Sequence, residues 1–542
     1  MKQFAIVLLL LIFFNPVQAQ SNGFEVLKSL EIMDQVYENL DLYFVDEPQL
    51  GKLSKTSIDA MLKELDPYTV YYHESNIEDY RLMTTGQYGG IGALIRRIND
   101  DTYIAEPYEG NPAEKSGLKA GDKIISIDGK PMHKKSSDDV STALKGPKGT
   151  AVKVEIERLS EGKKTISITR DEIKIPDVPY FGMVDSETGY VKLNSFTQTA
   201  AADVESAILK LKKDGMKKLV LDLRDNGGGL LIEAVKIVNF FVPKNTVVVT
   251  TKGRVKEENR VYTTLSEPID TEIPLAVLVD GGSASASEIV AGSLQDLDRA
   301  VILGETSFGK GLVQRTYDMK YGSKIKITIA KYYTPSGRCV QRLEYYDKET
   351  GEKPKEIADS LLKTFQTKNG RKVIDGRGIE PDLKIEPDDL SRLSAMLLTK
   401  NLIFNYSTEF ASKNASIPKS EDFKLSDSQY EEFKSFVLKD DFSYTTASEE
   451  ALKKMKETAE KEGYFNEVKS EYEAMMLKVT PSKSRDLDKF KNEISQMLEN
   501  EIVSRYYFQK GRTLNSFRYD KVLQKAKEIL GNTNEYNTIL KK

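Results

Sequence analysis

Apolar segments of strand length alternate with segments of helical spacing in the middle of the chain, and this alternation limits the fold more than any other feature. Three short apolar runs are typical of buried strands: Leu219–Leu223, Leu275–Val279 and Ala300–Gly304. The stretches between them, Leu230–Phe241 and Ser287–Leu297, have apolar residues at helical spacing. Strands and helices in this order predict βαβ units, and therefore an α/β core, which we place at residues 171–385.

The sequence on either side of this core predicts three further regions. Residues 20–84 carry apolar side chains at helical spacing, which predicts a helical N-terminal domain. Residues 85–170 hold short β-rich runs broken by glycine, which predicts a compact β-rich module. Residues 386–542 are rich in Lys and Glu, with helical runs near 447–476 and 485–511, which predicts an appended helical region. The predicted fold class is therefore multidomain α+β.

The first nineteen residues have the pattern of a secretory signal peptide. Lys2 precedes an apolar run from Phe4 to Phe14, and Val17-Gln18-Ala19 places small residues where a signal peptidase cleaves. The apolar run is about eleven residues long, whereas a membrane-spanning helix needs about 20. We therefore expect cleavage after Ala19 and export, to the periplasm, over a membrane anchor that is retained.

Composition narrows the chemistry that the chain can perform and the partners that it can bind. Lys and Arg number 79 against 83 Asp and Glu, so no excess of positive charge favours nucleic acid as a partner. The chain has two histidines, His73 and His133, and one cysteine, Cys339. These counts exclude an intramolecular disulfide and leave little for a metal site, so we expect no metal or cofactor. A hydrolase built from this chain would need one of the two histidines or another base.

Three serines stand in a turn between a predicted strand and a predicted helix: Gly281-Gly282-Ser283-Ala284-Ser285-Ala286-Ser287-Glu288-Ile289. Small residues at such a turn can leave a hydroxyl exposed while backbone N–H groups at the helix start face an anion. This geometry suits a nucleophilic serine. An ordinary helix N-cap is the alternative, because Ser287 beside Glu288 is good helix-start chemistry, and the segment alone leaves both open.

A lysine between two glycines follows the next predicted strand, in Ser307-Phe308-Gly309-Lys310-Gly311-Leu312-Val313-Gln314. The strand can bring the Lys310 ammonium close to the serine turn. A lysine acts as a general base only when it is neutral, and burial favours the neutral state by lowering the pKa. A phosphate-binding or merely exposed lysine is the alternative, although the glycine spacing of a P-loop is absent.

Another buried-type strand ends in three successive glycines, in Leu221-Asp222-Leu223-Arg224-Asp225-Asn226-Gly227-Gly228-Gly229. Because these glycines have no side chains, the backbone N–H groups of the turn can approach a reacting carbonyl and stabilise an oxyanion. A plain tight turn is the alternative for this segment taken by itself.

Together and in this order, the three segments resemble those of the C-terminal processing proteases, the tail-specific serine peptidases of family S41, which pair a serine with a lysine. The resemblance covers about residues 30–385 and implies a crotonase- or ClpP-like α/β core. It implies Ser285 as the nucleophile and Lys310, 25 residues further on, as the base. Gln314 matches the glutamine that orients the lysine.

The resemblance also implies which backbone groups stabilise the oxyanion. These are the N–H of Ala286 and the N–H of Gly229, with Gly228 as the alternative glycine. A mechanism of this kind needs no histidine, so the scarcity of His does not count against a hydrolase.

Residues 85–170 resemble a PDZ domain inserted between the helical N-terminal domain and the core. Gly90-Ile91-Gly92-Ala93 stands where such domains hold a peptide's terminal carboxylate with backbone N–H groups, which implies Gly90, Ile91 and Gly92 as the binding residues. Pro112–Asp122 matches the turn and helix before the strand at 123–127. Ala93 replaces a larger apolar residue of many PDZ loops, which leaves the size preference of the pocket open.

The resemblance implies an exported serine endopeptidase that binds protein C-termini through its PDZ domain and cleaves peptide bonds through an acyl-enzyme. Its partners would be protein or peptide substrates and an envelope adaptor protein, and the terminal helices could support oligomerisation. One alternative is a catalytically idle PDZ scaffold, against which the intact set of Ser285, Lys310 and Gln314 argues. Another is an acyl-CoA enzyme, since acyl-CoA folds also use glycine-rich oxyanion holes; the signal segment and PDZ module argue against it.

Overall fold

The computed structural model describes the chain over three stretches, residues 21–74, 77–345 and 354–542. The predicted signal peptide, residues 1–19, lies outside these stretches. Within them, no helix combines the length and the apolar character that a membrane span requires.

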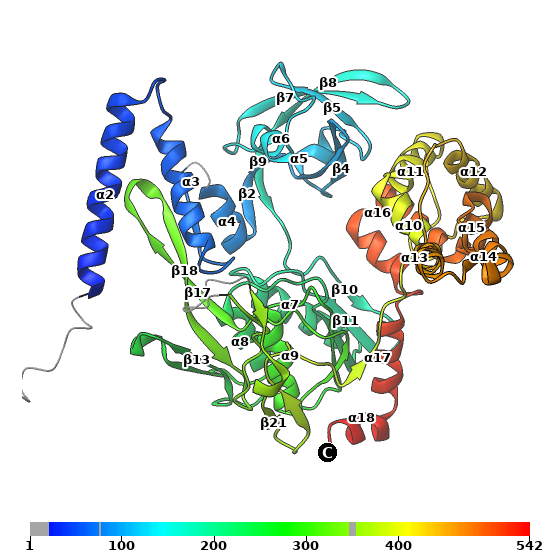
Figure 1. The fold of residues 1–542 in the computed structure, drawn as a ribbon. Coiled ribbons are helices and arrows are strands. Elements are labelled where there is room, and N and C mark those ends of the chain that lie inside the picture. Colours follow the sequence, from blue (N-terminus) through cyan, green and yellow to red (C-terminus); the bar gives the residue numbers. More distant parts are fainter. Residues whose placement is uncertain (1–20, 75–76, 346–353) are drawn as a thin grey trace, which may run out of the picture. The chain divides into compact units, whose positions relative to one another are not determined.

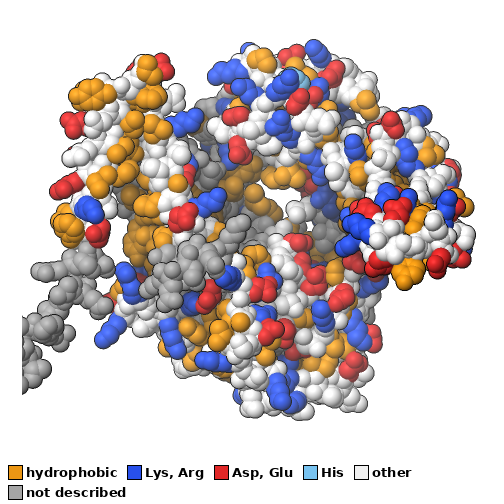
Figure 2. Space-filling model, in the orientation of Figure 1, with side chains coloured by type: hydrophobic (Ala, Val, Ile, Leu, Met, Phe, Trp, Pro, Cys, Tyr) orange, Lys and Arg blue, Asp and Glu red, His pale blue; other side chains and the backbone are white. Residues whose placement is uncertain are grey.

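The first of two compact units joins the chain up to Glu74 with Gln314–Thr328. Its elements are α2 (Ser21–Tyr43), α3 (Leu50–Lys63), β1 (Val70–Tyr72) and parts of β17 (Leu312–Asp318) and β18 (Lys324–Tyr333). The predicted N-terminal helices are present, but β1 differs from the helical prediction because it pairs antiparallel with the start of β18. Large apolar side chains of α2 are exposed, as Figure 2 shows along this helix.

The second unit, Ser75–Val313 with Ile329–Lys542, begins with the β-rich module. After α4 (Ile77–Thr85), the strand β2 (Gln87–Gly90) pairs with β9 (Asp171–Lys174) where the chain enters and leaves the module. The module's sheet has the strand order β3-β4-β5-β7-β8, with β6 paired to β5. Its elements are β3 (Ala93–Ile98), β4 (Asp101–Pro107), α5 (Pro112–Lys115), β5 (Lys123–Ile127), β6 (Lys130–Pro131), α6 (Ser137–Leu144), β7 (Ala151–Arg158) and β8 (Gly162–Thr169).

A six-stranded sheet with the order β10-β11-β12-β15-β16-β23 forms the centre of the second unit. Its strands are β10 (Tyr180–Met183), β11 (Thr188–Lys192), β12 (Lys218–Asp222), β15 (Leu275–Val279), β16 (Val301–Gly304) and β23 (Leu383–Lys384). The pairs from β11 to β23 are parallel, and only β10 runs antiparallel to its neighbour. The three buried strands expected from the sequence are therefore neighbours in one parallel sheet.

Alternate residues of these strands face two different apolar layers, which explains why the strands are apolar throughout. Leu221 and Val277 pack in the same cluster as three helices, α7 (Ala200–Lys213), α8 (Leu231–Asn239) and α9 (Ala286–Asp296). Val220 and Leu278 pack in a second cluster, together with Leu523, Ala526 and Ile529 of α17 (Lys521–Gly531). Figure 1 shows α17, in red, beside the sheet.

Among the described residues, a separate antiparallel sheet and two small ladders complete the part of the unit before residue 386. In the sheet, β13 (Val247–Gly253) pairs with β14 (Arg260–Thr263) and with the end of β18. The small strands are β19 (Leu343–Glu344), β20 (Lys355–Glu356), β21 (Thr364–Gln366) and β22 (Lys372–Ile374).

The region after residue 386 is helical, as predicted, and it has a hydrophobic core of its own. Its helices are α10 (Arg392–Thr399), α11 (Leu402–Lys413), α12 (Asp427–Leu438), α13 (Ala447–Glu462), α14 (Phe465–Val479), α15 (Lys483–Lys489), α16 (Lys491–Ser516), α17 and α18 (Thr533–Ile539). Tyr430, Phe433 and Leu498 are among the buried side chains of this core. The helical region therefore packs around a core of its own, and α17 extends from it to pack against the central sheet.

Leu523→Ala should lower the free energy of unfolding by about 2–5 kcal/mol, because it opens a cavity where α17 meets the sheet. Glu528→Ala, on the exposed side of the same helix, should change that energy by less than about 0.5 kcal/mol. Denaturant unfolding of both variants measures the difference. Equal effects of the two changes would contradict the packing of α17 on the sheet.

Candidate functional site

Ser285 stands between β15 and α9 in a backbone conformation that side chains rarely adopt. Its φ is +58° and its ψ is −110°, and such a conformation costs about 1–3 kcal/mol and persists only where the surrounding structure holds it. Here the Ser285 N–H donates to Glu288 Oε2 at 2.8 Å. The Ser285 carbonyl accepts from the Ile289 N–H at 2.9 Å and from the buried Tyr332 hydroxyl at 3.1 Å. This strand-to-helix turn resembles the elbow that presents a nucleophile at a helix N-terminus.

The two neighbouring serines serve the scaffold. The Ser283 hydroxyl donates to the Leu223 carbonyl at 2.8 Å, and the Ser287 hydroxyl donates to the Asn226 carbonyl at 2.8 Å. Both serines are fully buried, whereas Ser285 is partly exposed. Of the three hydroxyls in the turn, that of Ser285 is therefore the one a substrate can reach.

The buried carboxyl group of Glu288 ties the serine turn to the lysine loop. Its Oε2 accepts from the N–H of Ser285 and from the N–H of Lys310, each at 2.8 Å, so the two nitrogens are at most twice that distance apart. Its Oε1 accepts from the Gly309 N–H at 2.7 Å and from the Ser307 hydroxyl at 2.6 Å. Burial raises the pKa of Glu288, and these four hydrogen bonds act against that rise.

Lys310 and Gln314 lie in different units. The Lys310 side chain is partly buried at the end of the loop that precedes β17. Gln314 belongs to the first unit, where its Nε2 donates to Thr328 Oγ1 at 3.2 Å. The structure thus brings the backbones of Ser285 and Lys310 together, while the expected contact of Gln314 with Lys310 stays a prediction.

The glycine turn after β12 lies against the serine turn. A Cβ on Gly228 would lie 2.7 Å from the Ala284 carbonyl oxygen and 2.9 Å from the Ala286 nitrogen, and the φ of Gly228 is +99°. The Gly228 N–H already donates to Asn226 Oδ1 at 2.9 Å. Over the described stretches, the Gly229 N–H has no hydrogen-bond acceptor. Ala286 is the first residue of α9, so its N–H has no acceptor within the helix. This arrangement favours Gly229 over Gly228 as the expected oxyanion donor.

Asn226 is a residue that the sequence reasoning missed. It is fully buried, and its Nδ2 donates to the Leu193 carbonyl at 2.8 Å. Its backbone carbonyl accepts from the Ala284 N–H at 3.0 Å and from the Ser287 hydroxyl at 2.8 Å. Asn226 therefore sets the distance between the glycine turn and the serine turn. The one feature of the sequence that could have indicated this role is the position of Asn226 directly before the three glycines.

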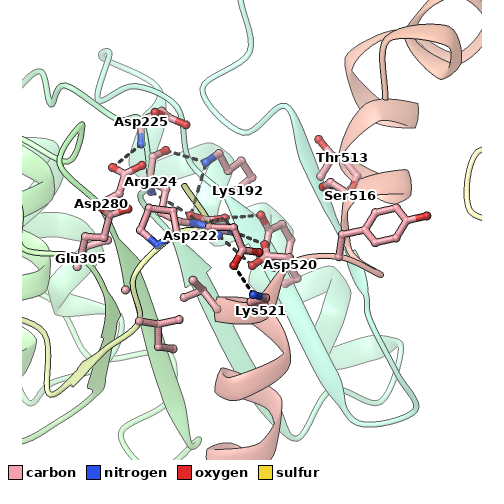
Figure 3. Close-up of a pocket in the computed structure, with 18 of the residues that line it drawn as sticks. Lys192, Asp222, Arg224, Asp225, Asp280, Glu305, Thr513, Ser516, Asp520 and Lys521 are labelled. Atoms are coloured by element: carbon pink, nitrogen blue, oxygen red, sulfur yellow. Dashed lines mark hydrogen bonds and ion pairs between the residues drawn. The ribbon is translucent and has the colours of Figure 1, made fainter. Parts of the chain in front are cut away.

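A cluster of charged side chains lies at the carboxyl end of β12, beside a cavity of about 530 Å³ (Figure 3). The sequence did not predict this cluster. Asp222 accepts from the Tyr190 hydroxyl at 2.6 Å and from Arg224 Nη2 at 2.6 Å, while Lys192 lies 3.5 Å away. Burial by itself would raise the pKa of Asp222, but the Arg224 and Lys192 charges outweigh it and hold that pKa well below its usual range. Arg224 also pairs with Asp520.

The expected carboxylate-binding loop of the β-rich module joins β2 to β3. The Ile91 carbonyl accepts from the Ala113 N–H at 2.7 Å, and the Gly92 carbonyl accepts from the Tyr108 N–H at 2.9 Å. Beside the loop is a small cavity of about 50 Å³, lined by Tyr88, Ile91, Ala93, Ile95, Ser141, Leu144 and Lys145. Its walls come from β3, an edge strand, and from α6, so an extended peptide could add to β3.

Both histidines lie outside the core, because residues 171–385 contain none. His133 contacts Asp101 in the β-rich module at 2.9 Å. Over the described stretches, no group of three or more His, Cys, Asp or Glu side chains could hold a metal ion.

Gly228→Ala should disturb the site strongly, because the new methyl group would collide with the backbone of the serine turn and the positive φ disfavours alanine. Gly227→Ala is the matched control, since a Cβ there meets nothing within 4 Å and no positive φ is involved. We expect the rate at which a fluorophosphonate modifies Ser285 to fall at least about tenfold in the first variant. Similar rates in both variants would show that the glycine turn does not contact the serine turn.

Glu288→Gln keeps the size of the side chain but turns one acceptor oxygen into an amide donor that faces other donors. Each buried partner left without an acceptor costs about 1–3 kcal/mol, so the melting temperature and the fluorophosphonate reactivity should both fall. Glu305→Gln, at the partly exposed end of β16, is the control and should change neither. A Glu288→Gln protein that melts and reacts like the unchanged chain would refute the role of Glu288.

Comparison with protein-family models identifies three segments of the chain. Residues 187–345 match peptidase family S41, and residues 103–158 match the PDZ domain. Residues 393–530 match the C-terminal helical domain of probable PDZ-proteases, which gives the helical region after residue 386 a counterpart that the sequence reasoning did not find.

Curated relatives and a solved structure match part of the chain. A carboxy-terminal-processing protease of Bartonella bacilliformis is 37% identical over 334 residues, which are 60% of this chain and 76% of the relative. A probable CtpA-like serine protease of Staphylococcus aureus is 38% identical over 317 residues, and the chain spans 62% of its length. The solved photosystem II D1 C-terminal processing protease is 30% identical, with 66% of this chain and 88% of that chain covered and a TM-score of 0.37.

The S41 match contains both the serine turn and the lysine loop, and the match to the Bartonella relative extends over most of that protein. The chain therefore belongs to peptidase family S41, carries a PDZ domain, and has C-terminal processing proteases among its homologues.

Proposed function

We propose that the chain is an exported serine endopeptidase that binds protein C-termini through its PDZ domain and cleaves peptide bonds with a Ser–Lys pair. The observation that carries the proposal is the shared carboxyl oxygen of Glu288, which accepts from the backbone N–H of both Ser285 and Lys310. Two residues that come from separate loops are thereby held at one place, next to a glycine turn whose Gly229 N–H meets no acceptor within the described residues.

In the first step, the Ser285 hydroxyl oxygen attacks the peptide carbonyl carbon and its proton passes to the neutral amine of Lys310. The N–H groups of Ala286 and Gly229 stabilise the oxyanion. The Lys310 ammonium then gives its proton to the leaving amine, and an acyl-enzyme remains on Ser285. Water attacks this ester with Lys310 again as the base, which releases the new C-terminus and restores the serine. Gln314 orients the lysine in this scheme.

In this proposal, the PDZ domain binds the C-terminus of the substrate. A protein C-terminus adds as a strand to β3, and the backbone of Gly90, Ile91 and Gly92 binds its carboxylate. The small cavity with Ala93 in its wall suits a short side chain at the terminal position. Support for this part comes from the edge position of β3 and from the family match of residues 103–158.

The cellular setting forms part of the same proposal. The pattern of residues 1–19 supports export to the periplasm, with membrane association through a retained segment as the alternative. The exposed apolar side chains of α2 support oligomerisation through the terminal helices. An envelope adaptor protein is proposed as a further partner, and a crotonase- or ClpP-like relationship is proposed for the core between residues 171 and 385.

Ser285→Ala and Lys310→Ala should each lower the rate of cleavage of an unfolded protein by at least about a thousandfold, because either change removes a member of the reacting pair. Lys310→Arg should be as inactive as Lys310→Ala, because a guanidinium does not become a neutral base. Mass spectrometry of the products measures the rates and the new C-termini. Ser266→Ala, at an exposed serine, is the control, and undiminished cleavage by Ser285→Ala or Lys310→Ala would overturn the proposal.

A further inference from the structure

An aspartate of the C-terminal helical region reaches the charge cluster at the carboxyl end of β12. Asp520 is the N-cap of α17, and its Oδ1 accepts from the Leu523 N–H at 2.9 Å. The same carboxylate binds the Arg224 guanidinium through two hydrogen bonds, Nη1 to Oδ1 at 3.0 Å and Nη2 to Oδ2 at 2.6 Å. Figure 3 shows Asp520 beside Arg224 and Asp222.

Arg224 is therefore held between two carboxylates. Its Nε and Nη2 also contact Asp222, and its backbone N–H donates to Asp222 Oδ1 at 2.9 Å. Its carbonyl accepts from Lys192 Nζ at 2.7 Å. The cluster contains two carboxylates and two cations, and Asp222 is only 1% exposed. Without Asp520 the cluster would carry an uncompensated positive charge, which is unfavourable beside the buried Asp222.

The residues that follow Arg224 form the glycine turn of the catalytic centre. Asp225 donates its N–H to Asp280 Oδ1 at 2.9 Å. Asn226 comes next, and its carbonyl accepts from the Ala284 N–H and the Ser287 hydroxyl of the serine turn. Gly229 lies five residues after Arg224. A shift of Arg224 would consequently move the start of the turn whose N–H groups must face the oxyanion, and misplacement by about 1 Å can cost a factor of about 100 in rate.

Docking of α17 does not by itself require this ion pair. Leu523, Ala526 and Ile529 already bury an apolar face against the sheet. A buried ion pair adds little net stability compared with apolar packing. We therefore expect the Asp520–Arg224 pair to orient Arg224 more than to stabilise the docking of α17.

We propose that Asp520 is a positioning residue for the proteolytic centre: it fixes Arg224, and through Arg224 the glycine turn that supplies an oxyanion donor. The helical region after residue 386 thereby contributes one side chain to the organisation of a site that lies in another domain. This inference rests on the proposed function for its catalytic part, whereas the ordering of the turn can be tested without it.

The test compares Asp520→Asn with the unchanged chain and with Asp388→Asn. Asparagine is a good N-cap and has nearly the same shape, so α17 can still begin at its N-cap while the carboxylate is lost. Asp388 forms an exposed ion pair at 2.5 Å with Lys521, the first residue of α17. Asp388→Asn therefore removes a different ion pair of α17 and controls for effects on the docking of this helix. Asp520→Ser, which keeps a capping oxygen, is the second variant should Asp520→Asn not fold, and Asp520→Glu restores the charge.

Two readouts decide the matter. Hydrogen exchange of a peptide covering residues 224–231 should be at least about tenfold faster in Asp520→Asn and unchanged in Asp388→Asn; this holds even if the chain cleaves no peptide. With a peptide substrate, kcat should fall at least about tenfold while KM changes less than about twofold, and Asp520→Glu should recover part of kcat.

Unchanged exchange in residues 224–231 of the folded Asp520→Asn and Asp520→Ser proteins would overturn the proposal. So would a kcat within about twofold of the unchanged chain, or a loss of equal size in Asp388→Asn. If Ser285→Ala cleaves the peptide as fast as the unchanged chain, the proposed function fails, and the exchange result alone then decides the role of Asp520.

Discussion

One buried carboxyl group, that of Glu288, holds together the loops on which the candidate site depends. The serine turn begins a helix and the lysine loop follows a different strand, so no local rule of sequence places them side by side. Glu288 accepts hydrogen bonds from the backbone N–H groups of Ser285 and Lys310. It therefore fixes the main chain of both loops and not only their side chains. Because burial makes the group costly unless its acceptors are used, the surrounding loops are held in a single arrangement.

The parts that could be predicted from the sequence are those fixed by local pattern. Apolar runs such as Leu275–Val279 predicted the strands of the core, because a strand covered on both faces must be apolar at every position. The serine turn and the glycine turn follow such strands, and the carboxyl ends of parallel strands meet at one edge of a sheet. Ser285 could be separated from Ser283 and Ser287 only by a resemblance; the structure adds a physical reason, since the other two hydroxyls donate to buried carbonyls.

What could not be predicted depends on contacts between residues distant in sequence. Asn226 looks like an ordinary turn residue until its bonds to Leu193 and Ala284 are seen. Asp520 lies 296 residues beyond Arg224, and an N-cap aspartate gives no sign that it also binds a distant guanidinium. β1 forms a strand only because β18 supplies its partner. In each case tertiary structure, and not propensity, decides the outcome.

Labelling with a fluorophosphonate, followed by peptide mapping, measures whether Lys310 activates Ser285. We expect one phosphonylated residue, Ser285, in the unmutated protein and almost no adduct in Lys310→Arg, because a proton must leave the hydroxyl as it attacks phosphorus. An adduct on a different residue, or equal labelling of Ser285 in Lys310→Arg, would show that Lys310 does not activate Ser285.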